Sequence, residues 1–222
     1  IENPNYQYWD IFRIAKQHNP SLQTALFSTW LDNRTRLVGD GLSEAGGRKL
    51  DYYFDGFELD LDRFPHDKSR TYIKDIDELV TDGAARYLLE QGPDLSWVYL
   101  EFTDDVGHMF GDGPELTKAV TLMDGNIGKI WSAVENRQDA TNENWLVIVT
   151  TDHGRDVATG KSHGGQSARE RTTWIATNSQ NLKERFSDTP AVVDILPSIV
   201  NHLKLTVPSK IADQLDGQPF ID

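Results

Sequence analysis

The chain has no cysteine, and its 22 lysines and arginines are outnumbered by 35 aspartates and glutamates. The absence of cysteine excludes disulfide bonds and thiolate metal ligands, which leaves histidine and carboxylate to hold a transition metal. The formal net charge of -13 argues against a nucleic-acid-binding protein, because affinity for phosphate backbones comes from lysine and arginine. An anionic substrate would have to be attracted by bound cations.

Long apolar runs are also absent, and no stretch is long enough to span a bilayer. A chain of 222 residues is long enough to bury a real core. We expect a single α/β domain over residues 1–222, with an irregular excursion or lid at 33–67, where Asp, Gly and aromatic residues follow no sustained period. Because the chain opens on Ile1-Glu2-Asn3-Pro4 without a methionine or signal-like segment, we expect a fragment or a processed form.

Hydrophobic periodicity predicts the main elements. Apolar residues at helical spacing predict helices over four segments: 6–17, 72–91, 115–134 and 191–203. Apolar runs predict strands over four others: 24–28, 97–102, 145–150 and 172–177. Nearly continuous apolar strands that alternate with helices are typical of a mostly parallel central sheet with helices on both faces, which is the fold class we expect.

Three short clusters of acidic residues and histidines lie between residues 104 and 165: Asp104-Asp105-Val106-Gly107-His108, Asp152-His153-Gly154 and His163-Gly164-Gly165. The first two come directly after predicted strands, and ligands of open α/β sheets bind at the carboxyl ends of strands. We therefore expect both carboxylates at the same sheet edge. The residues Asp104 and His108 are close enough to reach one ion across a tight turn or a first helical turn, and the glycine-rich loop lets His163 join them.

Each cluster alone has an ordinary explanation. An Asp and a His four residues apart usually mark a solvated helix face, and Asp-His-Gly is compatible with a helix cap and turn. The combination, with two clusters at strand ends, favours a metal site. The other three of the six histidines fall on a helix end, in an irregular stretch and on a helix, and we expect surface or satisfied core roles for them: His18, His66 and His202.

The residues Thr103 to His108, Thr151 to Gly154 and Gly160 to Gly165 together resemble the alkaline phosphatase superfamily, especially its type I phosphodiesterase and nucleotide pyrophosphatase branch. The likeness extends to both ends of the chain and leaves out mainly residues 33–67. It implies an alkaline-phosphatase-like fold with two divalent metal ions. The first ion would be held by Asp104, His108 and His163, and the second by Asp152 and His153. Three histidines favour zinc or manganese over the calcium of sulfatases.

The family completes the second site with an N-terminal Asp and a Thr or Ser nucleophile, and no segment here matches either. The pair Ser28-Thr29 follows a later strand without a preceding metal-binding Asp, so we do not expect it to be the nucleophile. We therefore expect the nucleophile half of the site to be missing, and the isolated chain to be inactive. The short interval between His153 and His163 differs from that of animal-type nucleotide pyrophosphatases, so the nucleotide specificity of that branch is not carried over.

The resemblance implies a metal-dependent hydrolase of phosphoric esters, above all a phosphodiesterase, that acts by in-line displacement through a covalent phosphoryl-enzyme. Its expected partner is an anionic phosphoester substrate, and its favoured location is periplasmic or extracellular. One alternative is a sulfatase, phosphonate hydrolase or phosphomutase of the same superfamily, and another is a non-catalytic domain that binds metal or an anion. Four cations near the third cluster are available for substrate oxygens, although each alone is more simply a surface residue: Arg155, Lys161, Arg169 and Arg171. Of these, Lys161 is the preferred substrate-binding candidate because it lies beside His163.

Overall fold

The structure is a computed structural model that describes residues 3–222, and its centre is a three-stranded parallel sheet. The strand order is β2-β1-β3, with both neighbours parallel to β1. The bounds of these strands are Thr24–Ser28 for β1, Tyr52–Phe54 for β2 and Leu95–Tyr99 for β3. Parallel strands need a crossover connection, and between β2 and β3 this is the helix α2 (Thr71–Gln91).

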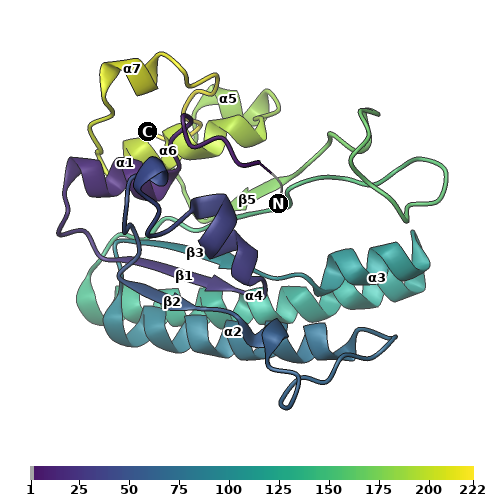
Figure 1. Cartoon of the computed structure of the whole chain (residues 1–222). Coiled ribbons are helices and arrows are strands. Elements are labelled where there is room, and N and C mark those ends of the chain that lie inside the picture. Colours follow the sequence, from purple (N-terminus) through teal and green to yellow (C-terminus); the bar gives the residue numbers. More distant parts are fainter. Residues whose placement is uncertain (1–2) are drawn as a thin grey trace.

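The side chains of β1 alternate between two hydrophobic cores, one on each face of the sheet. Ala25 and Phe27 pack in a core with α2 and with α4 (Pro114–Thr141). On the other face Leu26 packs with α1 (Ile11–His18) and α6 (Ile195–His202). Figure 1 shows α2 and α4 side by side under the sheet and α1 and α6 above it. The predicted α/β class with helices on both faces is confirmed.

Several predicted boundaries are wrong. The helix predicted over 115–134 runs on to Thr141, and the strands predicted at 145–150 and 172–177 begin only at Ile148 and Ile175. Two other boundaries are wrong because a carboxylate caps the start of a helix. Helix α1 begins at Ile11 rather than near Tyr6, since Asp10 caps it by accepting a hydrogen bond from the Arg13 amide at 2.9 Å. Strand β3 ends at Tyr99 rather than at Phe102, where helix α3 (Phe102–Phe110) begins.

The prediction that Asp104 and Asp152 leave the same sheet is also wrong. Strand β4 (Ile148–Thr150) pairs antiparallel with β5 (Ile175–Thr177) in a separate two-stranded sheet. The apolar run that predicted a central strand is only half-buried. Trp145 and Val147 pack against the same core as Phe27, so the run is covered by side-chain packing without joining the parallel ladder.

Residues 33–67 form short pieces, among them a π-helix over Asn33–Val38 and 3-10 turns over Ser43–Ala45 and Phe57–Leu59. They also contain β2, which sequence periodicity did not predict because three residues are too few to show a pattern. Beyond β5 the chain forms a 3-10 turn at Val192–Asp194 and two further short helices, α5 (Glu184–Ser187) and α7 (Ser209–Ala212). Among residues 3–222, no helix combines the length and the apolar character needed to cross a membrane.

Candidate metal centre

Helix α3 presents Asp104 and His108 on the same face, one turn apart. His108 Nε2 lies 3.1 Å from Asp104 Oδ2. The other ring nitrogen, Nδ1, lies 2.7 Å from the carbonyl oxygen of Lys161. A proton on Nδ1 would be donated to that carbonyl and would leave Nε2 as a lone-pair ligand. Of the two arrangements considered for this pair, the structure has the helical turn.

The loop between β4 and β5 brings His163 onto the same pair. His163 Nε2 lies 3.0 Å from His108 Nε2 and 3.7 Å from Asp104 Oδ1. In a tetrahedral zinc site with bonds of about 2.0–2.1 Å, neighbouring ligand atoms are about 3.3 Å apart. The 3.0 Å between the two Nε2 atoms, and the 3.1 and 3.7 Å from these atoms to the two carboxylate oxygens of Asp104, are thus close to the spacing of ligand atoms around one zinc ion.

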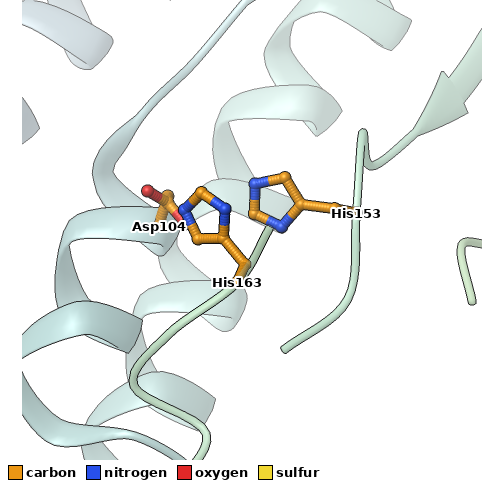
Figure 2. A group of neighbouring side chains, drawn as sticks. All are labelled: Asp104, His153 and His163. Carbon is orange, nitrogen blue, oxygen red and sulfur yellow. The ribbon is translucent and has the colours of Figure 1, made fainter. Parts of the chain in front are cut away.

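Beside this triangle lies His153, whose ring stacks on that of His163 with centroids 3.8 Å apart and 19° between the planes. Figure 2 shows Asp104, His153 and His163 converging from separate segments, and one donor atom from each lies within 4.8 Å of the others. His153 Nε2 is also 3.4 Å from Asp152 Oδ2. The Asp152 side chain is 68% exposed, so it stands at the outer margin of the cluster.

The electrostatics favour a neutral imidazole at His163. Burial lowers the pKa of His163, and the neighbouring rings of His153 and His108 lower it further, against the opposite effect of Asp104. A neutral imidazole is the form that binds a metal ion. The five predicted metal ligands thus lie in one region. Their assignment to two separate ions stays a prediction.

A cation also reaches the cluster. The Arg155 guanidinium donates to the backbone carbonyl of Asp104 at 2.6 Å and to its carboxylate, and the Arg155 side chain is only 11% exposed. It passes close over Gly107, where a Cβ would lie 2.2 Å from Arg155 Cζ. Sequence reasoning gave Arg155 the role of a surface cation. Its place directly after Asp152-His153-Gly154 was the available signal that it belongs to the site.

Sequence reasoning missed two buried carboxyl groups near the start of α3, those of Asp77 on α2 and of the N-cap residue Glu101. Burial raises the pKa of Asp77 to about 6 and that of Glu101 to about 8. The sequence does carry a signal for Asp77, because it lies between Ile73 and Val80 on the apolar stripe of α2. An acid on such a stripe is buried and needs hydrogen-bond donors.

The other predicted cations have different surroundings. Lys161 contributes its backbone carbonyl to His108, and its role in binding substrate stays a prediction. Arg169 forms an ion pair with Asp112 at 2.5 Å. Arg171 Nε donates to the carbonyl of Gln166 at 3.1 Å.

The residues that we did not expect to act as metal ligands or as the nucleophile have structural partners. His18 accepts a hydrogen bond from the Thr206 amide, and His66 stacks on Tyr72. His202 lies 3.2 Å from the carbonyl oxygen of Asn144. The hydroxyls of Ser28 and Thr29 are buried and donate to the Trp30 carbonyl and to Asp77, respectively. These contacts support the structural roles expected of these residues.

The match to a family model, with a fold that agrees, places the chain in the alkaline phosphatase superfamily. A model of the family "type I phosphodiesterase / nucleotide pyrophosphatase" matches residues 7–216, and the chain belongs to that family. The predicted family and its fold class are therefore confirmed.

Two similar proteins are longer than this chain. It is 31% identical over 123 residues to alkaline phosphatase PhoD of Zymomonas mobilis subsp. mobilis, a match that covers 50% of this chain and 21% of that protein. Its fold is similar to a crystal structure of phosphoglycerate mutase from Leishmania mexicana, with a TM-score of 0.55 and 12% identity. That likeness covers 95% of this chain and 39% of the other chain. The chain thus spans less than half the length of either protein.

Proposed function

We propose that this chain carries the metal centre of a metal-dependent hydrolase of phosphoric esters, and that its preferred substrates are phosphodiesters. The observation that carries the proposal is the triangle of residues Asp104, His108 and His163. Their two Nε2 atoms lie 3.0 Å apart, and each lies 3.1 or 3.7 Å from one oxygen of the Asp104 carboxylate, close to the spacing of ligands around one zinc ion. These three residues would hold one divalent ion, and Asp152 with His153 would contribute to a second. Membership of the type I phosphodiesterase family supports the reaction class.

The donor set favours zinc, with manganese second, because imidazole and carboxylate suit both metals. A bound divalent ion supplies Lewis acidity, which lowers the pKa of a coordinated hydroxyl and stabilises charge on a leaving oxygen. The carbonyl of Lys161 orients the His108 ring through Nδ1. Arg155 offsets the charge of Asp104 and restrains its carboxylate. We assign the ammonium group of Lys161 to a non-bridging oxygen of the phosphoester.

One observation is compatible with the non-catalytic alternative as well. The hydroxyls of Ser28 and Thr29 are held in buried hydrogen bonds, so these residues do not supply a nucleophile in the conformation described. A domain that binds a metal or an anion without turnover would have the same ligand cluster.

The location outside the cytoplasm, periplasmic or extracellular, follows from the family resemblance and stays a prediction.

The test is metal analysis and turnover with the gene product at its full natural length. We expect hydrolysis of bis(p-nitrophenyl) phosphate to exceed that of p-nitrophenyl phosphate and p-nitrophenyl sulfate. A chelator should abolish the activity, and zinc should restore it. Bound metal without turnover of any of the three would support the non-catalytic alternative, and fastest turnover of the sulfate would overturn the phosphoester assignment. The His202→Ala variant, changed outside the cluster, should keep the wild-type metal content and activity.

A further inference from the structure

Helix α3 carries two of the proposed metal ligands, but its own N-cap side chain does not cap it. The N-cap residue is Glu101, whose carboxyl accepts from the Tyr99 hydroxyl instead of bonding to the first turn. The first amide groups of a helix need acceptors from elsewhere. In α3 they come from Asp77 of α2, which accepts from the Glu101 amide at 3.1 Å and from the Phe102 amide at 2.8 Å.

The Asp77 carboxylate is fully buried and joins three parts of the fold. Its Oδ1 also accepts a hydrogen bond from the Thr29 hydroxyl at 2.5 Å, at the end of β1. A carboxylate at a helix N-terminus is stabilised both by the amide donors and by the helix dipole. Asp77 therefore connects α2, the end of β1 and the start of α3.

The metal ligand Asp104 lies in the same first turn that Asp77 caps. Its amide donates to the Glu101 carbonyl at 2.9 Å, so its backbone is built directly on the capped residue. One turn further along the same face lies His108. An ion pair between Arg70 and Asp105, 2.8 Å long, also holds α3, but the Arg70 side chain is 34% exposed and restrains the helix less.

We propose that Asp77 is a positioning residue for the metal centre. Its carboxylate caps α3 from a neighbouring helix and thereby fixes where Asp104 and His108 stand relative to His163. The inference rests on the proposed function, since the ligands that Asp77 positions are the proposed ones. Asp77 does not touch the metal or the substrate, so its effect appears in the affinity and geometry of the site.

The experiment measures zinc affinity by competition with a chromophoric chelator, and coordination geometry by the visible spectrum of bound cobalt(II). Asp77→Asn keeps the shape of the side chain but removes its charge and replaces one of the two accepting oxygens with an NH2 group, which cannot accept a hydrogen bond. We expect it to weaken zinc binding by about 10- to 100-fold and to change the cobalt spectrum. The matched control is Thr29→Val, which removes one hydrogen bond to Asp77 but keeps both bonds to α3. It should leave affinity and spectrum unchanged.

His163→Ala separates this inference from the proposed function. If His163→Ala binds zinc like the wild type, the metal centre itself is wrong. If His163→Ala loses affinity while a folded Asp77→Asn keeps both the wild-type affinity and the wild-type cobalt spectrum, the positioning role alone is overturned. Circular dichroism establishes folding. Should Asp77→Asn not fold, the smaller Asp77→Ser takes its place, and the same two outcomes decide.

Discussion

His108 and His163 direct their Nε2 atoms at each other across 3.0 Å, although 55 positions separate them in the sequence. The His108 ring meets the Lys161 carbonyl through Nδ1, which needs a proton to make that hydrogen bond. Its Nε2 is then a lone pair that faces a second imidazole nitrogen. Such a contact is stable when a proton or a cation lies between the two nitrogens. Protons and metal ions therefore compete for the same position, next to the carboxylate of Asp104.

The first prediction concerns which ligands share an ion. His108→Ala and His163→Ala should both lose the same, more tightly held metal ion, because each removes a corner of the triangle with Asp104. Asp152→Ala and His153→Ala should chiefly affect a second ion. A lost ligand should lower affinity by more than the about 10- to 100-fold typical of outer partners. Elemental analysis after dialysis at graded free zinc measures this. Wild-type metal content in all four variants would rule out the site, and His18→Ala is the control.

The second prediction concerns the packing of Arg155 over Gly107. A methyl group at Gly107 would lie 2.2 Å from Arg155 Cζ, so Gly107→Ala forces the guanidinium away from Asp104. Losing hydrogen bonds to a charged group costs about 1.5–3 kcal/mol, which exceeds the gain of about 1 kcal/mol from alanine in a helix. We expect Gly107→Ala to destabilise the wild type but to stabilise the Arg155→Ala variant.

Urea unfolding of the four proteins in this double-mutant cycle measures the coupling between residues 107 and 155. Gly125→Ala on α4 is the matched control, because a Cβ there meets no atom within 4 Å. It should have the same effect in both backgrounds. Equal effects of Gly107→Ala in both backgrounds would show that Arg155 does not pack as described.

The sequence was sufficient to predict the elements whose pattern is local. Helix α2 and strand β1 were found within a residue of their bounds, because long apolar periodicity decides the helix and a short buried run between polar residues decides the strand. The three clusters do lie together, but the shared sheet edge from which we expected this is absent, because β4 belongs to a separate sheet and Asp104 lies on α3. The separation of β4 from the parallel sheet was not predictable, because an apolar run indicates burial and not the partner strand. Likewise, the start of α3 is set by Asp77, which is 25 residues away from Phe102.

The third prediction is a pH dependence caused by Asp77. Burial raises the pKa of Asp77 to about 6, against the lowering effect of its hydrogen bonds, whereas an aspartate in an unfolded chain titrates near about 3.9. Between these values the folded protein holds a proton that the unfolded chain has lost. The contribution of Asp77 to the free energy of unfolding is therefore greatest below the lower value and is lost as pH rises through the higher one.

Metal-free wild type should therefore lose stability relative to Asp77→Asn as the pH rises from about 4 to about 6. Urea unfolding in the presence of a chelator, at several pH values in this window, measures the difference. The carboxyl groups of Glu101 and Asp105 interact electrostatically with Asp77 and are present in both proteins, so the difference reports Asp77 together with its effect on the pKa of Glu101. A difference in stability that does not change with pH would contradict the raised pKa.

The last prediction is a pH dependence of stability with the opposite sign. It concerns Asp194, whose hydrogen bond from the Gln218 amide holds the C-terminal segment. Its buried carboxylate accepts from the Gln218 and Ala191 amides, each at 2.8 Å, and from Arg185 Nε at 3.0 Å. Burial by itself would raise the pKa of Asp194, but these hydrogen bonds and the Arg185 charge outweigh it, and the pKa is lowered. A lowered pKa stabilises the fold above the unfolded value of about 3.9, and this stabilisation is lost as pH falls through the folded value.

Asp194→Asn should accordingly cost about 1.5–3 kcal/mol of unfolding free energy at neutral pH, because charge-assisted hydrogen bonds are lost in a buried position. The cost should shrink once the wild-type carboxylate is protonated in acid. Urea unfolding at neutral and at acidic pH measures both values. Asp213→Asn is the control, because Asp213 is exposed, and it should change stability by less than about 0.5 kcal/mol. An equal cost for Asp194→Asn at both pH values would show that the ionised carboxylate is not what holds the segment.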